Sequence, residues 1–243
     1  MKLKLTLEYD GASFRGWARQ PGERTVEGVV REALAAVYPS WEGLVVAGRT
    51  DTGVHATGQV ASVDVEGGPP PERASEALNA DLPEDVAVLR AEEMGAECHA
   101  RFSARSRSYR YRVLARPTRA PLEAGRVLWW PRPLDLEALS AAAALLPGTH
   151  DFRAFTPTGA RYEVFRRNVN AAQWTVEGDR CDFTITAESF LRHMVRTLVG
   201  TMLESGPDAP DRLATLLLGR PRSEAGLTAA PWGLYLEQVE YDA

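Results

Sequence analysis

The spacing of apolar residues switches repeatedly between a two-residue and a 3.6-residue repeat over the first ninety residues. Residues 3–9 alternate leucine with polar side chains, which predicts a strand. Residues 26–37 carry valine, alanine and leucine at helical spacing, after Thr25, a favoured N-cap residue, and before Pro39, so we expect a helix there. Further strands are expected at 44–47, 59–65 and 86–90, with a short helix from Pro69 through Leu78. The order predicts a β-α-β-β-α-β arrangement.

A similar succession follows in the second half of the chain. Helices are expected at 134–146 and 190–203, and strands at 163–176, 180–187 and 232–241. The helix at 190–203 has a continuous apolar stripe, with Arg192 and Arg196 one turn apart on its flank. We therefore predict an α/β (α+β) fold with two similar subdomains, residues 1–105 and 106–243. Mixed, mainly antiparallel sheets flanked by helices would form both, with a positively charged cleft between them as the ligand site.

Composition excludes several classes of protein. The 243 residues are 44% hydrophobic, which is enough for a sizeable core, and no apolar run reaches the roughly 18 residues of a membrane helix. The first residues alternate in polarity and do not form a signal-peptide core, so we expect a cytoplasmic protein. Cys98, Cys181 and the four histidines lack metal-ligand spacing, and we expect neither a metal site nor a disulfide framework.

The distribution of charge points in two directions. A net charge of −5 and a pI near 5.5 argue mildly against nucleic-acid binding. The segment 101–119, however, has no acidic residue and seven arginines: Arg101, Arg105, Arg107, Arg110, Arg112, Arg116 and Arg119. These arginines predict a positive face suited to phosphates. A GC-rich genome would produce the same bias toward arginine, and composition leaves both readings open.

The segment 48–58 is the most unusual stretch, with three glycines spaced five residues apart between two expected strands. Glycines permit tight turns and close approach of a ligand, so this loop would present Asp51, with Arg49 two residues earlier, at a cleft. The carboxylate would then act as a base or a nucleophile. Alternatively, Asp51 closes a turn through its side chain and Arg49 is its surface ion pair. A phosphate-binding P-loop is excluded because Val54 and His55 follow Gly53.

The pattern Gly48-Arg-Thr-Asp-Thr-Gly-Val-His-Ala56 resembles the catalytic loop of the tRNA pseudouridine synthase A family. Other segments resemble that family in the same order along nearly the full chain. They are Tyr9-Asp-Gly-Ala-Ser-Phe-Arg-Gly-Trp17, Thr25-Val-Glu-Gly28, Ala100-Arg-Phe-Ser-Ala104, Tyr109-Arg-Tyr111, Ser189-Phe-Leu-Arg-His-Met-Val-Arg196 and Ala230-Pro-Trp-Gly-Leu-Tyr-Leu236. Ala18 and Trp232 depart from the family pattern, and these departures affect local packing and not the chemistry.

The resemblance implies an isomerase that converts uridine to pseudouridine at positions 38, 39 and 40 in the anticodon stem-loop of tRNA. Asp51 would be the essential carboxylate, and a guanidinium of Arg49 or Arg196 would keep it ionised. Tyr109 matches the family tyrosine that packs against the target base. Whether Asp51 attacks the ribose or the pyrimidine ring stays open, and so does the alternative that Tyr109 and Tyr111 are core residues.

The resemblance also implies a homodimer that works without a cofactor. The N-terminal subdomain would carry the Asp51 loop, and the C-terminal subdomain the tyrosine strand and the arginine helix. Arg105, Arg107 and Arg192 are the expected phosphate contacts to the nucleic acid. Two other classes compete: a non-catalytic RNA-binding protein, and a metal-dependent hydrolase with an aspartyl nucleophile that acts on a small molecule.

Overall fold

The computed structural model describes residues 1–242, which form two compact units. The first unit contains Met1–Arg107 and the chain from Tyr235 onward, and the second unit is Ser108–Leu234. The last strand thus lies with the first unit. The division into 1–105 and 106–243 that the sequence indicates stays a prediction.

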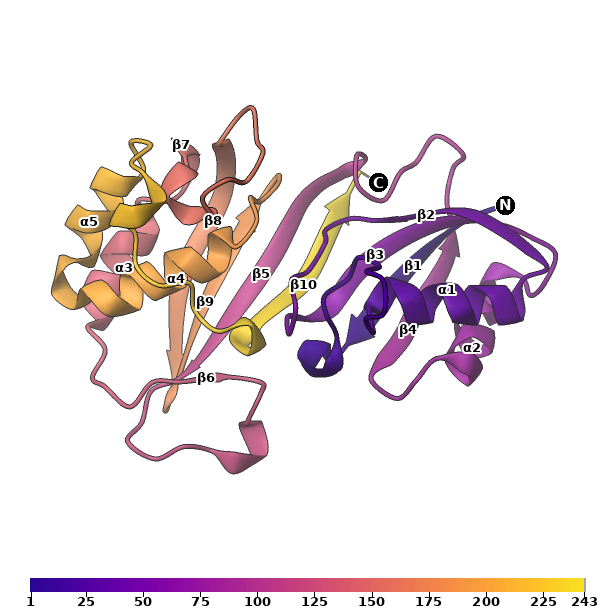
Figure 1. The fold of residues 1–243 in the computed structure, drawn as a ribbon, viewed down its shortest axis with the longest axis horizontal. Coiled ribbons are helices and arrows are strands. Elements are labelled where there is room, and N and C mark those ends of the chain that lie inside the picture. The colour runs from indigo at the N-terminus through magenta and orange to yellow at the C-terminus, as the bar shows by residue number, and fades with distance from the viewer. Residues whose placement is uncertain (243) are drawn as a thin grey trace. The chain divides into compact units, whose positions relative to one another are not determined.

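The first unit has the expected β-α-β-β-α-β order. Its elements are β1 (Lys2–Tyr9), α1 (Val26–Val37), β2 (Ser40–Val46), β3 (His55–Glu66), α2 (Pro71–Asp81), β4 (Val86–Glu93) and the C-terminal β10 (Leu234–Tyr241). The strands lie in the order β4-β1-β3-β10, and β2 also pairs with β3. β1 is antiparallel to both neighbours, whereas β10 runs parallel to β3. Helices α1 and α2 lie next to each other in front of these strands (Figure 1).

The apolar periods explain this packing. Leu3, Leu5 and Leu7 share one face of β1 and are fully buried, as their alternation predicts. The hydroxyl of Thr25 accepts a hydrogen bond from the backbone N–H of Gly28 at 3.2 Å and caps α1. These elements form the core on which the loop between β2 and β3 stands.

The second unit has the other strands and three helices. Its elements are β5 (Ala104–Leu114), β6 (Leu128–Trp129), α3 (Leu136–Ala144), β7 (Gly148–Asp151), β8 (Arg166–Glu177), β9 (Arg180–Ala187), α4 (Met194–Ser205) and α5 (Ala209–Leu216). The strands follow the order β5-β9-β8-β7, with β6 parallel to β5. The pairs β7–β8 and β8–β9 are antiparallel. The prediction of mixed, mainly antiparallel sheets flanked by helices is therefore confirmed for the described residues.

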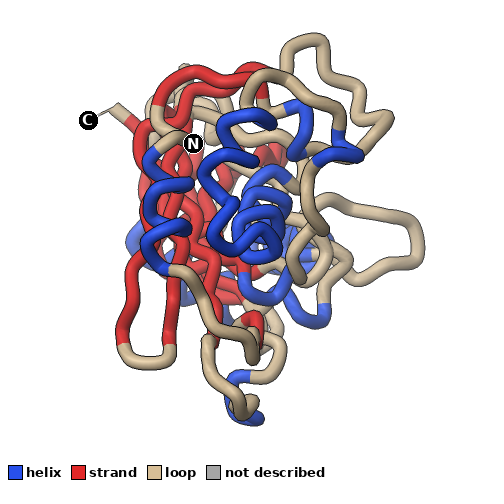
Figure 2. Tube along the Cα trace, turned by 90° about the vertical axis from the view of Figure 1, so that its left-hand side faces the viewer, coloured by secondary structure: helices blue, strands red, loops and turns tan. Residues whose placement is uncertain are grey.

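Helices α3, α4 and α5 form one cluster beside β8 and β9 (Figure 1). The segment between β5 and α3 extends away from that cluster, and at the bottom of Figure 2 it is a loop with one short helical turn. The described residues, 1–242, also include six short 3₁₀ turns, at Gly11–Ser13, Pro121–Glu123, Arg153–Phe155, Gly206–Asp208, Arg222–Glu224 and Pro231–Gly233. Within residues 1–242, no helix is long and apolar enough to cross a membrane.

One predicted helix begins later than expected. Residues 190–193 are not helical, and α4 begins at Met194 because His193 has a left-handed backbone with φ of 62°. Arg192 lies before the helix, and its backbone N–H donates to the Tyr162 hydroxyl at 3.0 Å. The prediction that Arg192 and Arg196 lie together on one helical flank is therefore wrong.

Candidate active site

Asp51 lies in the loop of residues 47–54 between β2 and β3, called here the Asp51 loop. The backbone N–H of Val54 donates to the backbone carbonyl of Asp51 at 3.1 Å and closes a tight turn. Gly53, the third residue of this turn, has φ of +76°, as a type II turn requires. The Asp51 side chain is half-buried. Since backbone atoms close the turn, an asparagine at position 51 would keep this hydrogen bond.

A second segment holds the Asp51 loop through the backbone. The N–H of Trp17 donates to the carbonyl of Thr50 at 3.0 Å, and the N–H of Gly53 donates to the carbonyl of Phe14 at 3.3 Å. The side chains of Phe14 and Trp17 are buried. Gly16 has φ of +89°, and a Cβ there would lie 2.8 Å from the Thr50 carbonyl oxygen. Two segments of the family resemblance, 9–17 and 48–56, are thus in direct contact.

Two buried polar side chains, Tyr9 and Gln59, lie beneath the Asp51 loop and contact it, and we call them, together with the buried Thr50 of the loop itself, the buried polar network. The Tyr9 hydroxyl lies 2.7 Å from the Thr50 hydroxyl oxygen. Nε2 of Gln59 donates to the Tyr9 hydroxyl at 3.2 Å and to the carbonyl of Gly48 at 2.6 Å. Burial raises the pKa of Tyr9 to about 12, although hydrogen bonds to Thr50 and Gln59 oppose that rise.

Sequence reasoning missed this network, although one signal for it was present. Gln59 lies opposite Leu7 in the pairing of β1 with β3, and it shares a strand face with Ala61 and Val63. A polar residue on an apolar strand face needs a hydrogen-bond partner. Here the partners are Tyr9 and the Gly48 carbonyl.

Arg107 holds the first residue of the Asp51 loop. Its guanidinium is buried and donates twice to the carbonyl of Ala47, from Nε at 3.3 Å and from Nη2 at 3.0 Å. It also donates to the carbonyls of Ala104, at 3.2 Å, and Arg101, at 2.6 Å. The side chain thus satisfies carbonyls inside the first unit. Its expected contact with nucleic acid stays a prediction.

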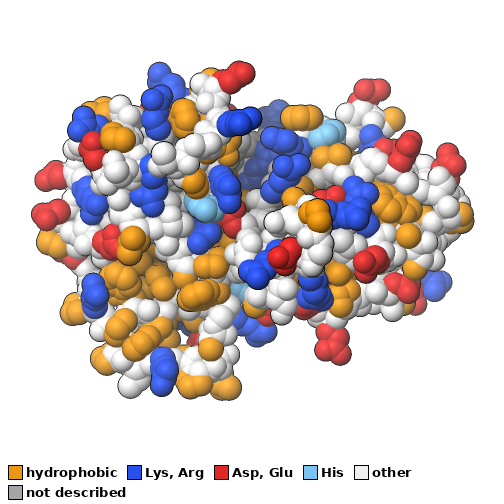
Figure 3. All heavy atoms as spheres, in the orientation of Figure 1, with side chains coloured by type: hydrophobic (Ala, Val, Ile, Leu, Met, Phe, Trp, Pro, Cys, Tyr) orange, Lys and Arg blue, Asp and Glu red, His pale blue; other side chains and the backbone are white. Residues whose placement is uncertain are grey.

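Acidic residues from outside the segment 101–119 pair with several of its arginines. Arg105, which is exposed, forms an ion pair with Asp242. Arg110 pairs with Asp182 at 3.3 Å, and Arg116 with Asp179 at 3.6 Å. Over α1 and α2 as well, basic and acidic side chains are interspersed on the visible face (Figure 3). The arginine-rich segment is therefore less positive in the fold than its sequence indicates.

Tyr109 and Tyr111 lie on the same side of β5 in the second unit. The Tyr109 ring is 8% exposed and meets the ring of Phe190 edge-on, with centroids 5.0 Å apart. Tyr111 is fully buried, and its hydroxyl donates to the carbonyl of Ala230 at 2.7 Å. Tyr111 is therefore a core residue, as the alternative interpretation of this strand expects, whereas Tyr109 keeps a small exposed area.

Arg196 is half-buried in the first turn of α4, in the second unit. Its Nε donates to the carbonyl of Ala229 at 2.8 Å, and the N–H of Ala229 donates to the Arg196 carbonyl at 3.0 Å. Burial raises the pKa of Tyr111, and the positive charge of Arg196 partly opposes this rise. These contacts fix the base of the guanidinium within the second unit.

The predicted site residues fall into two groups. Asp51, exposed Arg49, Arg105 and Arg107 belong to the first unit, and Tyr109, exposed Arg192 and Arg196 to the second. In the first unit the structure brings Arg107 to the start of the Asp51 loop. In the second, Arg192 and Arg196 are separated by the left-handed residue His193.

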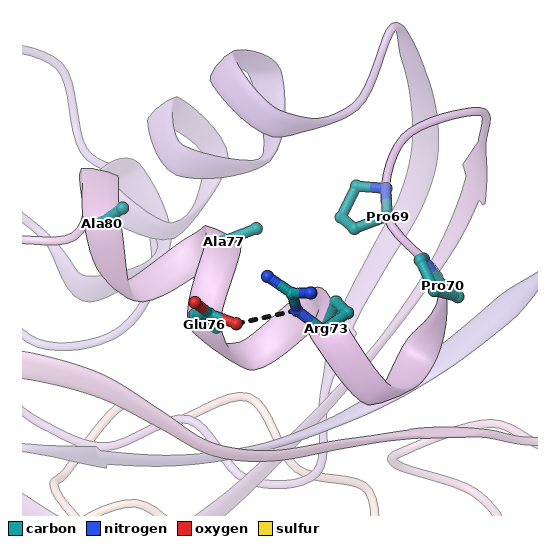
Figure 4. Close-up of a pocket in the computed structure, with 6 residues that line it drawn as sticks. All are labelled: Pro69, Pro70, Arg73, Glu76, Ala77 and Ala80. Atoms are coloured by element: carbon teal, nitrogen blue, oxygen red, sulfur yellow. Dashed lines mark hydrogen bonds and ion pairs between the residues drawn. The ribbon is translucent and has the colours of Figure 1, made fainter.

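A hollow of about 430 Å³ lies beside α2, and no residue of the Asp51 loop lines it. Its lining consists of Pro69, Pro70, Arg73, Glu76, Ala77 and Ala80. The two charged side chains in it pair with each other at 2.8 Å (Figure 4).

Among residues 1–242, no group of three or more His, Cys, Asp or Glu side chains is placed to hold a metal ion. The expected independence from metal stays a prediction.

Comparison with known proteins identifies the family. A family model described as tRNA pseudouridine synthase matches residues 6–103 and 142–242. The chain is 40% identical to tRNA pseudouridine synthase A of Bacillus pumilus over 246 residues, covering 100% of both chains. It is 43% identical to the enzyme of that name from Dinoroseobacter shibae, covering 99% of this chain and 96% of the relative. It is 42% identical to the enzyme of that name from Moorella thermoacetica, covering 98% of this chain and 99% of the relative. The chain belongs to the tRNA pseudouridine synthase family, whose members isomerise uridine to pseudouridine in tRNA.

Proposed function

We propose that this chain converts uridine to pseudouridine in tRNA with the Asp51 carboxylate as its nucleophile. The observation that carries the proposal is a half-buried carboxylate within the family's matched region, on a loop held by backbone hydrogen bonds and a buried polar network. Such a loop keeps a nucleophile in one orientation.

The reaction conserves atoms and electrons. The bond between N1 of uracil and C1′ of the ribose breaks, and a bond between C5 and C1′ forms. C5 loses a proton and N1 gains one. No oxidant or reductant is consumed, so we propose that the reaction needs neither a cofactor nor a metal.

Three further residues are proposed to bind the target uridine. Tyr109 stacks on the base, since an aromatic ring replaces the neighbours that an extruded base loses. Arg49 and Arg196 supply positive charge, which favours the ionised carboxylate. The hydrogen bond from Arg196 to the Ala229 carbonyl supports this role because it orients the guanidinium. Arg105 and Arg192 are proposed phosphate contacts, since both have the exposure that such a role needs, whereas the predicted phosphate contact of Arg107 competes with the hydrogen bonds that its buried guanidinium makes to the carbonyl of Ala47.

We propose positions 38, 39 and 40 of the anticodon stem-loop as the target uridines, a homodimer as the working assembly, and the cytoplasm as its location. Supporting these proposals is the full-length similarity to proteins named tRNA pseudouridine synthase A. Transcripts that keep uridine at only one of the three positions would test which uridines are modified. The molar mass of the protein in solution, measured by light scattering, would test the dimer.

The test of Asp51 uses unmodified tRNA, the purified protein and nucleoside analysis. Asp51→Asn and Asp51→Ala should abolish pseudouridine formation while tRNA affinity changes by less than about tenfold, roughly 1.4 kcal/mol. Asp81→Asn, at an exposed aspartate that ends α2, is the matched control and should keep activity.

Two outcomes would contradict the proposal. The first is substantial pseudouridine formation by Asp51→Asn when mass spectrometry excludes deamidation back to aspartate. The second is a wild-type protein that binds tRNA without modifying it, which would favour the non-catalytic RNA-binding class. An EDTA arm with prefolded tRNA addresses the hydrolase class, because metal removal should leave pseudouridine formation unchanged.

A further inference from the structure

The buried polar network reaches the Asp51 loop from two strands. Tyr9 ends β1, Gln59 lies in β3, and both side chains are buried. The pairing of these strands shifts between Leu7, opposite Gln59, and Tyr9, opposite Ala56. An irregularity of this kind redirects side chains, and here the two polar groups meet beneath the loop.

The network contacts the loop at two points that flank Arg49. Gln59 donates to the carbonyl of Gly48 at 2.6 Å, and the Tyr9 hydroxyl meets the hydroxyl of Thr50 at 2.7 Å. Thr50 directly precedes Asp51 in the chain. Movement of either contact would therefore rotate the backbone from which the Asp51 carboxylate projects.

Both the nitrogen and the oxygen of the Gln59 side-chain amide form hydrogen bonds. Its Nε2 serves Tyr9 and Gly48, and its Oε1 accepts from the N–H of Val60 at 3.2 Å. Because Gln59 donates to the Tyr9 oxygen, the Tyr9 proton is available for the Thr50 oxygen. The result is a chain of hydrogen bonds that joins Gln59, Tyr9 and Thr50.

We propose that Tyr9 and Gln59 are positioning residues, which set the orientation of the Asp51 carboxylate through Thr50 and Gly48. The inference rests on the proposed function of Asp51. The loop keeps separate backbone hydrogen bonds to Phe14 and Trp17, so loss of one hydroxyl group changes the orientation of the carboxylate while the fold persists. A displacement of about 1 Å at a reacting group can lower the rate by roughly 100-fold.

The main test is Tyr9→Phe, which removes the hydroxyl and keeps the ring. We expect kcat for pseudouridine formation to fall about 10- to 100-fold, with KM for tRNA changed less than about threefold. Tyr38→Phe is the matched control. Tyr38 is another buried tyrosine of the first unit, and its hydroxyl bonds to the carbonyl of Pro69 at 3.4 Å. This control should keep the wild-type kcat.

A double-mutant cycle tests the connection through Thr50. Thr50→Val should lower kcat about as much as Tyr9→Phe, and the double variant should be little worse than either, because all three remove the same hydrogen bond. Thr50→Ser keeps the oxygen and should lie closer to wild type than Thr50→Val. Gln59→Met, which removes both donors at similar volume, should also lower kcat more than it raises KM.

The outcomes separate this inference from the proposed function. If wild type forms pseudouridine and Tyr9→Phe is equally active, Tyr9 does not position Asp51. Additive losses in the cycle, or equal loss of kcat in Tyr9→Phe and Tyr38→Phe, would overturn the inference as well. If wild type forms no pseudouridine from unmodified tRNA, the proposed function itself fails.

Discussion

The Asp51 loop and the start of α4 hold the side chains of the proposed site, Asp51 and Arg196, in different ways. The loop has no regular secondary structure, and buried side chains satisfy its carbonyls, with Gln59 bound to Gly48 and Arg107 bound to Ala47. Arg196 instead belongs to a helix, whose backbone pairs directly with Ala229. The conformation of the loop therefore depends on a few polar atoms, whereas the position of Arg196 depends mainly on backbone packing.

Both regions bring two backbone segments close together at a glycine, and alanine at either glycine should have the largest effect on stability. A Cβ at Gly11 would overlap the carbonyl oxygen of Val54, and a Cβ at Gly200 would overlap that of Leu227. We expect Gly11→Ala and Gly200→Ala each to lower the free energy of unfolding by about 3 kcal/mol, measured by urea denaturation.

A third glycine provides the control for this pair. A Cβ at Gly95 would meet only the Cys98 sulfur, at 3.8 Å. Gly95→Ala should therefore change the free energy of unfolding by less than about 0.5 kcal/mol. If Gly11→Ala or Gly200→Ala were as stable as Gly95→Ala, close backbone approach would not be what holds that region.

Arg105 and Arg107 allow support of the Asp51 loop to be distinguished from binding of RNA. Arg107→Met removes a buried guanidinium from three carbonyls, and we expect it to lower the free energy of unfolding by about 2 kcal/mol. Arg105→Met removes an exposed ion pair with Asp242 and should cost less than about 1 kcal/mol. Urea denaturation of the two variants measures the difference.

The salt dependence of tRNA binding should show the opposite order. If Arg105 contacts one phosphate, its removal lowers the slope of log K against log salt by roughly 0.7–0.9. Arg107→Met, measured where it is folded, should leave that slope unchanged. A variant of Arg107 with wild-type stability and a reduced slope would show that this side chain serves RNA and not the loop.

Periodicity predicted most of the fold because it reports directly which side of an element is buried. The alternation of Leu3, Leu5 and Leu7 and the helical spacing after Thr25 have direct counterparts in β1 and α1. The start of α4 was predicted too early because the apolar stripe says nothing about the left-handed backbone at His193. Apolar spacing thus predicts faces better than ends.

The candidate site was predictable as a loop and not as a set of contacts. Three glycines around Asp51 indicated a shaped loop, but the partners of Gln59 and Arg107 come from segments distant in sequence. An arginine in a basic segment looks the same whether it is exposed, as Arg105 is, or buried, as Arg107 is. The two side chains are two residues apart on the same face of β5, so strand alternation does not separate them. Arg107 differs because the carbonyls of Ala47, Ala104 and Arg101 surround its guanidinium.

The smallest effect that we expect is a difference between the two units in how the free energy of unfolding declines at alkaline pH. Cys181 reports on the second unit and Tyr9 on the first. Burial raises the pKa of the Cys181 thiol from 9.0 to about 12, and that of Tyr9 from 10.0 to about 12. In the unfolded chain both groups lose their protons at the lower values, whereas the folded chain keeps them. The contribution of these two groups to the free energy of unfolding is therefore fully present below about pH 9, and it is lost as pH rises toward 12.

Between about pH 9 and pH 10 the loss due to these two groups should come mainly from Cys181, because unfolded tyrosine is still protonated there. Cys181→Ala should therefore flatten the decline in unfolding free energy over this interval, whatever its effect at neutral pH. Tyr9→Phe should leave the interval unchanged and flatten the decline only above about pH 10. Urea denaturation under reducing conditions, at half-unit steps of pH, measures both slopes. An unchanged slope in Cys181→Ala would mean that its thiol ionises alike in the folded and unfolded chains, and the buried side of β9 would then admit water more readily than the region around Tyr9.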